Sequence, residues 1–274
     1  MEVQAAPNPV ILAVAPNGGR RSKADHPALP LTASEVAHTA AECLEAGAAM
    51  IHTHVRAPDG GHILDAEAYR ATIAAIRAAI GDRLVVQITS EALGLYGPAE
   101  QRAVVQAVRP EAVSLALREL LPDASEEAAF AEFLSWLQRE KVTPQIILYT
   151  PEEARHLASL RQRGLLPWDK VAVLYVLGRY TPGQASSPGD LLPFLAPGEP
   201  AFGPWSVCAF GRQERACVTA AALLGGHLRV GFENNFFRPD GTMAQSNEES
   251  VAATRKAIEA CGLRFGTADD LRAM

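Results

Sequence analysis

The sequence lacks a secretion signal, a membrane-spanning segment and an excess of positive charge. The start, Met1-Glu2-Val3-Gln4, has no basic segment followed by an apolar one, so we expect no secretion signal. No apolar run reaches the roughly 20 residues that cross a bilayer. The net charge is -6, which disfavours binding to nucleic acid or to anionic membranes. We therefore expect a cytoplasmic protein with neither kind of partner.

Cysteine is scarce, and its few positions form no pattern. The four cysteines contain no Cys-x-x-Cys pair and are scattered at Cys43, Cys208, Cys217 and Cys261. This spacing argues against a disulfide framework and against a cysteine-based zinc site. Cys217 and Cys261 fall in predicted helices, where we expect them to be core residues. The pattern is typical of a reducing compartment.

What the sequence does contain is a regular alternation of short apolar runs with helical segments. Its 274 residues suit one α/β barrel, and 48% hydrophobic with 20% charged residues suits a globular protein with a full core. The apolar runs are rich in Val, Ile and Leu, as expected of parallel strands buried on both faces. We predict strands at 10–15, 50–55, 84–89, 112–117, 144–149, 171–177, 205–209 and 228–232.

Amphipathic segments separate these strands, and Gly follows several of them as a helix stop signal. We predict helices at 34–46, 66–80, 98–108, 126–140, 151–163, 189–195, 212–224 and 247–261. Eight β-then-α units indicate a single-domain (β/α)₈ TIM barrel over residues 1–274. A doubly wound open sheet is the alternative, but no Gly-x-Gly-x-x-Gly opens the first helix, so dinucleotide binding is unsupported. The segment 179–189, rich in Pro, Gly and Ser, is interpreted as one extended loop.

Two histidines and a distant glutamate are the candidate metal ligands. His52 and His54 are two residues apart in a predicted strand, so their side chains point the same way. Glu233 ends the eighth predicted strand. Strands two and eight both flank the first, whose small residues leave space above it. Two imidazoles and one carboxylate suit zinc with one open position, whereas calcium prefers oxygen ligands.

Arginines near the same ends of the strands are candidates for binding anions. Arg229 shares the strand face of Glu233, where a guanidinium needs an anionic partner, either a structural ion pair or a catalytic one. Arg20 and Arg21 lie in the first loop, which should overhang the active face. The other histidines are interpreted mostly as surface residues, with His227 at the opposite end of the barrel: His26, His38, His62, His156 and His227.

Several motifs in the right order make the chain resemble the β-keto acid cleavage enzymes, the family of 3-keto-5-aminohexanoate cleavage enzyme, along nearly its whole length. The matching stretches are 23–32, 45–48 leading into 52–56, 176–178, 211–212, 225–234 and 241–247. The resemblance implies a barrel that binds one zinc ion per subunit through His52, His54 and Glu233. It further implies a reaction with acetyl-CoA, in which a β-keto acid is split to give acetoacetate and a new CoA thioester.

The resemblance also assigns roles to other residues. Thr89 and Ser90 occupy the place of the donors that hold the keto acid carboxylate, and Ser114 matches a further hydroxyl that contacts substrate. Arg229 matches the arginine that assists in forming the species that attacks acetyl-CoA, sharing developing negative charge with the metal. The family further suggests a homo-oligomer.

Two departures from the family pattern bear on function. The usual Glu-Asp at the end of the eighth strand is Glu233-Asn234 here, and an amide cannot serve as a base. Where the aminohexanoate-cleaving member has an acid for its substrate's amine, this chain has Gly19-Arg20-Arg21. We therefore expect Asn234 beside Arg229 in the catalytic site, and Arg20 to select a substrate with a neutral or anionic side group.

Two other interpretations remain open from the sequence. A zinc hydrolase of the amidohydrolase type also uses His-x-His on a barrel, but it places the pair on the first strand and needs more histidines. A family member with impaired catalysis, in which Asn234 is the lesion, would keep the metal and lose turnover.

Overall fold

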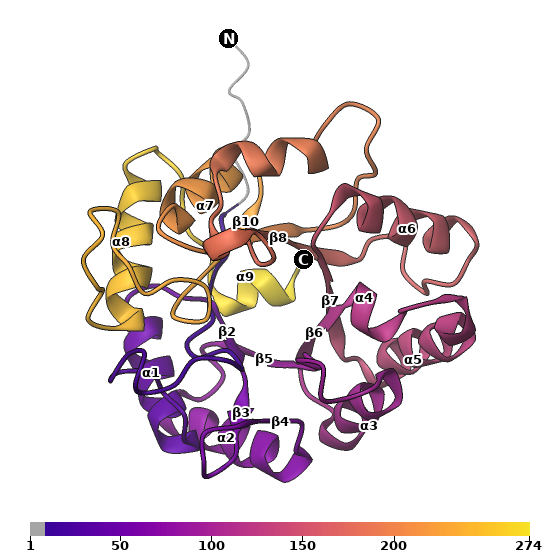
Figure 1. Cartoon of the computed structure of the whole chain (residues 1–274), viewed down its shortest axis with the longest axis horizontal. Helices are drawn as coiled ribbons and strands as arrows, with labels where there is room; N and C mark the ends of the chain where they lie inside the picture. The colour runs from indigo at the N-terminus through magenta and orange to yellow at the C-terminus, as the bar shows by residue number, and fades with distance from the viewer. Residues whose placement is uncertain (1–8) are drawn as a thin grey trace.

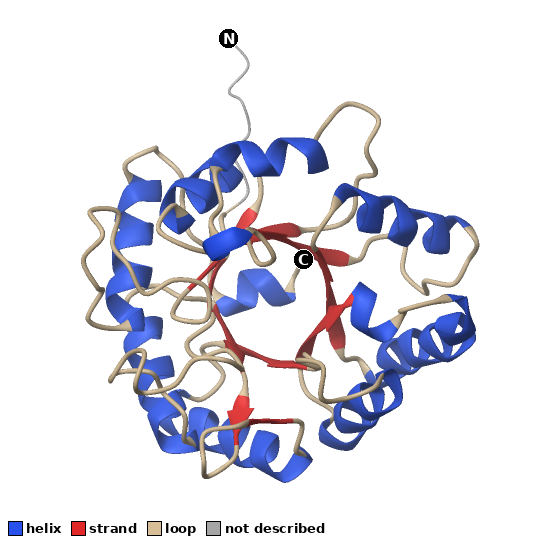
Figure 2. Cartoon of the chain, viewed as in Figure 1, coloured by secondary structure: helices blue, strands red, loops and turns tan. Residues whose placement is uncertain are grey.

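Eight parallel strands close into a barrel in the computed structural model, which describes residues 9–274 (Figure 2). Residues 1–4, on which the expected absence of a secretion signal rests, lie outside the described residues. Around the barrel the order is β1-β10-β9-β8-β7-β6-β5-β2. The strands are β1 (Leu12–Val14), β2 (Met50–Thr53), β5 (Val85–Thr89), β6 (Ala112–Ala116), β7 (Thr143–Leu148), β8 (Ala172–Leu177), β9 (Trp205–Ala209) and β10 (His227–Val230). This confirms the predicted TIM barrel.

Most helices surround the strands in an outer ring, and the last, α9 (Ala268–Arg272), lies inside it (Figure 1). The other α-helices are α1 (Ala33–Glu45), α2 (Ala66–Ile80), α3 (Pro98–Val108), α4 (Leu117–Leu120), α5 (Glu127–Glu140), α6 (Pro151–Gln162), α7 (Glu214–Leu223) and α8 (Asn247–Glu259). Three short 3₁₀ helices are η1 (Ala124–Glu126), η2 (Pro182–Gln184) and η3 (Pro188–Phe194). Local signals set the boundaries: Thr32 and Glu35 form a capping box before α1, and Gly81 ends α2 with a φ of 62°.

The structure differs from the sequence prediction in a few places. A small hairpin, β3 (Val55–Arg56) with β4 (His62–Ile63), follows β2 directly. The predicted loop 179–189 contains η2 and the start of η3, and the predicted helix at 189–195 is η3. Neither α4 nor α9 was predicted. These elements are all short, so their sequences carry little periodic pattern.

The barrel is closed at one end and open at the other. Leu271 of α9 packs against residues that begin strands, among them Ala13, Met50 and Val85. Figure 1 shows α9 in the middle of the ring. The opposite end, where strands give way to βα loops, is therefore the one left for a site. None of the helices that the structure describes is long and apolar enough to cross a membrane.

Candidate metal centre and active site

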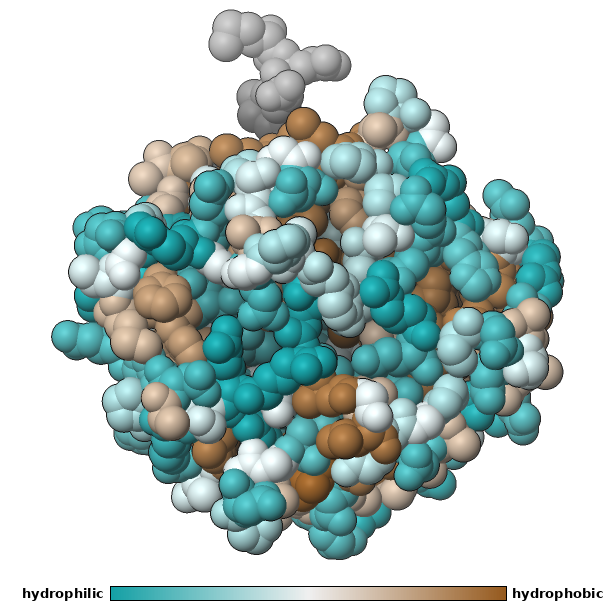
Figure 3. Space-filling view, viewed as in Figure 1, coloured by the Kyte–Doolittle hydropathy of each residue, from teal (hydrophilic) through white to brown (hydrophobic). Residues whose placement is uncertain are grey.

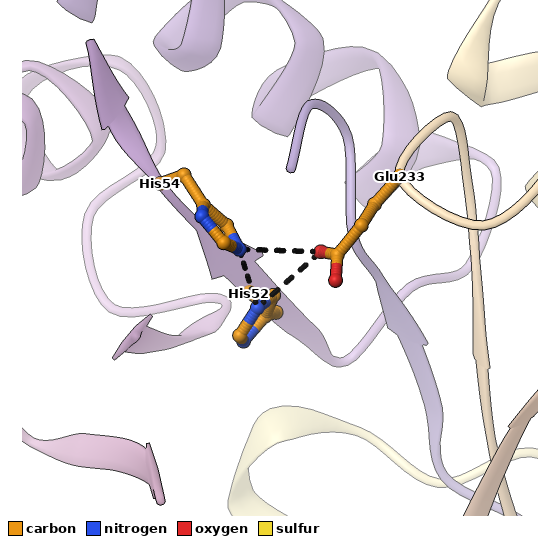
Figure 4. A group of neighbouring side chains, drawn as sticks. All are labelled: His52, His54 and Glu233. Carbon is orange, nitrogen blue, oxygen red and sulfur yellow. Dashed lines mark hydrogen bonds and ion pairs between the residues drawn. The ribbon is translucent and has the colours of Figure 1, made fainter. Parts of the chain in front are cut away.

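His52, His54 and Glu233 converge at the carboxyl ends of the strands (Figure 4). The Nε2 atoms of the two histidines are 3.2 Å apart. Glu233 Oε2 lies 3.4 Å from His52 Nε2 and 3.5 Å from His54 Nε2. β2 and β10 both pair with β1, so the ligands meet above the first strand as the sequence analysis expected.

The triangle formed by these three atoms fits a tetrahedral metal ion. With ligand bonds of about 2.0–2.1 Å, neighbouring ligands of a tetrahedral ion lie about 3.3–3.4 Å apart. The observed separations run from 3.2 to 3.5 Å. Glu233 Oε2 is buried and has no hydrogen-bond partner among the described residues, although a buried carboxylate oxygen normally has one. A cation between the three atoms would satisfy it.

Neighbouring side chains prepare both histidines as ligands. His52 Nδ1 lies 2.9 Å from Gln87 Oε1, an acceptor that places the ring proton on Nδ1 and leaves Nε2 free. Gln87 is itself held by a hydrogen bond to Gln145. Burial, reinforced by Arg229, lowers the pKa of His52 to about 3, so its imidazole is neutral at pH 7. Neutral imidazole is the form that binds a metal ion.

The carboxylate of Glu233 is ionised for a different reason. Burial alone raises its pKa, but Arg229, His52 and His54 outweigh that effect and hold the pKa well below its usual range. Glu91 approaches from the other side, with Oε2 3.8 Å from His54 Nδ1. The centre therefore combines two imidazole rings with one carboxylate, which is a donor set that suits zinc.

Gly18 in the loop after β1 gives Glu233 its space. Gly18 has a φ of 60°, and a Cβ there would lie 2.7 Å from Glu233 Cγ. We predict that Gly18→Ala displaces the carboxylate and weakens zinc binding about 10–100-fold, the usual effect of disturbing a metal ligand's supports. Competition with a chelator measures this affinity.

Gly81 provides the matched control for this prediction. Its φ is 62°, and a Cβ there would meet nothing within 4 Å. Gly81→Ala therefore carries the same backbone strain without touching the site. Equal zinc affinity in both variants would contradict a steric role for Gly18.

Arg229 is buried beside the three candidate ligands. Its Nη2 donates to Glu233 Oε1 at 3.1 Å, to Asn234 Oδ1 at 3.3 Å and to Cys208 Sγ at 3.3 Å. Its Nε and Nη1 are buried without a partner among the described residues. Arg229 lines the cavity that also borders His52. The guanidinium is thus tied on one side and has N–H groups left on the other.

The predicted hydroxyl groups divide into two that line this cavity and one that does not. Thr89 and Ser114 are among its lining residues. Thr89 Oγ1 accepts from Glu91 N at 3.0 Å and from Ser114 Oγ at 3.4 Å, and its own O–H remains free to donate to a ligand. Ser90 is buried beyond the cavity wall, where its Oγ donates to the Ser114 carbonyl at 3.3 Å.

A second, outer pocket adjoins the inner cavity and is lined by Arg20. The two share Glu91, Arg179 and Glu233. Arg179 is paired with Glu91 at 3.1 Å, and Arg21 lies 3.7 Å from Asp25. Figure 3 shows mostly hydrophilic surface around the centre of this face.

Sequence reasoning missed several residues of the site. Glu91 and Arg179 come just after β5 and β8. Because catalytic residues of such barrels gather at the strand ends, this position could have identified both as candidates. Gln87 lies two residues before Thr89 on the same face of β5. Glu214 begins α7 and carried no signal, because an acid at a helix start usually faces solvent.

Some predictions about individual residues were wrong. His26 and His62 are buried, not at the surface: His26 packs on Phe232, and the His62 ring lies 5.5 Å from that of His54. His38 and His156 are exposed as expected. His227 begins β10, away from the metal centre, and its Nδ1 accepts from Ile11 N. Of the two cysteines expected in the core, Cys217 is buried but Cys261 is exposed, because it follows the end of α8.

A comparison with known families decides between the enzyme classes left open above. The sequence profile of the beta-keto acid cleavage enzymes matches residues 9–274. The chain belongs to this family. Family membership therefore favours a β-keto acid cleavage enzyme over a hydrolase of the amidohydrolase type.

Curated relatives match nearly the whole chain. It is 28% identical to a 3-keto-5-aminohexanoate cleavage enzyme of Fusobacterium nucleatum, over 96% of each chain. It is 25% identical to a 3-oxoadipate:acetyl-CoA acetyltransferase of Cupriavidus necator, over 97% of this chain and 94% of that one. Among solved structures, ObcA in complex with oxaloacetate superimposes with a TM-score of 0.69 at 18% identity, covering 90% of this chain and 67% of that one. That likeness supports the barrel fold.

Proposed function

We propose that the protein cleaves a β-keto acid with acetyl-CoA: the acetyl group joins the two-carbon carboxylate end of the keto acid to give acetoacetate, and the remaining acyl group joins the released CoA as a new thioester. Family membership over residues 9–274 supports the class of reaction. The relatives from Cupriavidus necator and Paraburkholderia graminis are named as enzymes that use acetyl-CoA. The observation that carries the proposal is the convergence of His52, His54 and Glu233 next to Arg229 at the open end of the barrel.

We propose zinc as the metal, one ion per subunit. Two imidazoles and one carboxylate, with ligand separations of 3.2–3.5 Å, suit a tetrahedral ion with its fourth position open. When bound there, zinc supplies a Lewis acid that polarises a carbonyl oxygen. Gln87 contributes by holding the ring of His52 in the tautomer that can bind it.

The chain's own residues supply the remaining chemistry. The free O–H of Thr89 would donate to the carboxylate of the keto acid inside the cavity, and Ser114 supports it by donating to Thr89 Oγ1. The unpartnered N–H groups of Arg229 offer a fixed positive charge to oxygens on which negative charge develops. Fixed donors in a buried cavity cost no reorganisation when charge appears, so they stabilise the transition state more than water would.

The outer pocket favours a substrate with a neutral or anionic side group. Arg21 and Arg179 each have an acidic neighbour, whereas Arg20 has no ion-pair partner within the described residues. An exposed, unpaired guanidinium attracts a carboxylate and repels an ammonium group.

A panel of β-keto acids tests the function and the side-group preference together. We expect acetoacetate from zinc-loaded protein with acetyl-CoA, with the highest kcat/KM for a dicarboxylic keto acid. Arg20→Ala should lower that kcat/KM about 2–5-fold, as expected for an exposed charge pair. It should leave a neutral keto acid unaffected. A preference for a cationic keto acid would contradict the role of Arg20.

A second candidate is a family member that binds its metal but turns over poorly. Asn234 favours this alternative, because its amide accepts from Arg229 but cannot take a proton as a base. Full zinc content without acetoacetate from any keto acid in the panel would support this candidate over the first.

We infer that the protein works as a homo-oligomer in the cytoplasm. All four of its cysteines are free, and Cys261 is exposed, which suits a reducing compartment. Exposed leucines lie on η3 and α7, two elements that pack together: Leu192 in η3, Leu195 directly after it, and Leu223 and Leu224 at the end of α7. Light scattering of the purified protein measures the number of subunits, and a monomeric mass would contradict an oligomer.

A further inference from the structure

Glu214, the first residue of α7, is a buried carboxyl to which no part of the proposed function has been assigned. Its exposed fraction is 4%. Its hydrogen-bond partners are amide N–H groups and not cations. Burial raises the pKa of Glu214 to about 8 in spite of these donors. A buried acid without a close counter-charge is costly, so its presence beside an active site calls for a reason.

All three hydrogen bonds of Glu214 go to one turn, the segment 231–235 that carries Glu233. Oε1 accepts from Gly231 N at 3.2 Å and from Asn234 Nδ2 at 3.4 Å. Oε2 accepts from Asn235 Nδ2 at 3.3 Å. Gly231 has a φ of 133°, and a Cβ there would lie 2.5 Å from a backbone oxygen, so the turn has little freedom of its own. Glu214 thus fastens the turn from the side of α7.

The contact with Asn234 also fixes which way its amide points. Oδ1 faces Arg229, accepting from Nη2 at 3.3 Å, while Nδ2 faces Glu214. With the amide reversed, two donors would face each other at Arg229, and Asn234 Oδ1 would face Glu214 Oε1, which accepts from Gly231 N and so carries no proton even when the acid is neutral. Each mismatch leaves a buried polar group unsatisfied. An acceptor at position 214 therefore selects the orientation that gives Arg229 its acceptor.

We propose that Glu214 is a positioning residue which, through Asn234, orients Arg229 for the reaction, and that 214 and 234 form a matched acid–amide pair. Glu214 touches neither a metal ligand nor the cavity, so its effect is indirect. The kinetic part of this proposal rests on the proposed β-keto acid cleavage. The coupling between the two positions does not, because it is a property of the folded protein.

Two substitutions at 214 separate hydrogen bonding from packing. Glu214→Leu fills similar space but accepts no hydrogen bond, and we expect kcat per bound zinc to fall about 10–100-fold, the usual cost of losing a support behind an active-site residue. The KM for acetyl-CoA should stay within about twofold, since Glu214 does not line the pockets. Glu214→Gln keeps an acceptor for Asn234, so it should retain kcat within about fivefold.

A double-mutant cycle tests the pairing directly. Asn234→Asp alone replaces the amide that now donates to Glu214 Oε1 at 3.4 Å with a carboxylate, so two acceptor oxygens face each other there. We expect this variant to have a lower Tm and a lower kcat than the wild type. In the Glu214→Gln background the same change meets an amide that can donate to it. There, Asn234→Asp should cost about tenfold less in kcat and lower the Tm less.

Asn235→Ala is the matched control, because it removes a donor to Glu214 on the side away from Arg229. We expect it to lower the Tm and to leave kcat per bound zinc within about twofold. Equal effects of Asn234→Asp in both backgrounds, or a normal kcat per zinc in Glu214→Leu, would overturn the proposal. If the wild type cleaves no keto acid, the Tm values of the four proteins in the cycle still measure the coupling between positions 214 and 234. Failure of the proposed function can therefore be distinguished from failure of this inference.

Discussion

His52→Ala and Glu233→Ala are each expected to abolish zinc binding and acetoacetate formation together. Each substitution removes one of three ligands whose atoms lie 3.2–3.5 Å apart. A bound metal supplies several kcal/mol of transition-state stabilisation, so its loss should lower kcat/KM on the order of 10³-fold. Metal analysis of the purified variants gives zinc per subunit, and acetoacetate formation gives the activity.

The matched control for the ligand variants is an exposed histidine. His156→Ala removes an exposed imidazole from α6, an element that carries none of the candidate ligands. It should bind one zinc ion per subunit and keep its activity. Full zinc in both His52→Ala and Glu233→Ala would refute the assignment of the ligands, whatever their activity.

Arg229→Lys is expected to be nearly as damaging, but through the chemistry and not through the metal. Lysine keeps the positive charge but loses the planar guanidinium, in which Nη2 binds Glu233, Asn234 and Cys208 while Nε and Nη1 remain for substrate oxygens. Removing one fixed donor at a developing oxyanion typically costs a factor on the order of 10²–10³ in kcat. We expect a loss of that size with zinc content close to that of the wild type.

Arg255→Lys is the corresponding control for Arg229. Arg255 forms an exposed ion pair with Glu259 on α8, a kind of contact that contributes little. Its variant should match the wild type in kcat, zinc content and Tm. A normal kcat in Arg229→Lys, with intact zinc, would show that the guanidinium acts only as a structural partner of Glu233.

The barrel and the convergence of His52, His54 and Glu233 could be predicted from the sequence because their signals are periodic and local. Strands buried on both faces read as apolar runs, and His52 and His54 on one strand necessarily share a side. The position of Glu233 followed from the rule that strand ends meet at one face of the barrel. The predicted end of the last strand was two residues too long, because Gly231 turns the chain at a φ of 133°.

What the sequence did not predict depends on long-range packing. Glu214 looks like an ordinary solvated acid at a helix start until the turn 231–235 is packed onto it. His62 is buried because a hairpin of two-residue strands folds it over His54, and strands that short leave no pattern. The pairing of Arg179 with Glu91 joins residues 88 positions apart, which no local rule connects.

The candidate ligands come from both ends of the chain, and this has a consequence for how the protein matures. His52 and His54 are on β2, whereas Glu233 follows β10, and the two strands are held together only by β1 between them. A nascent polypeptide leaving the ribosome therefore lacks a complete donor set until its last strand has emerged and closed the seam. An ion held by this donor set would be acquired late in biogenesis and would favour the closed cylinder over partly assembled forms.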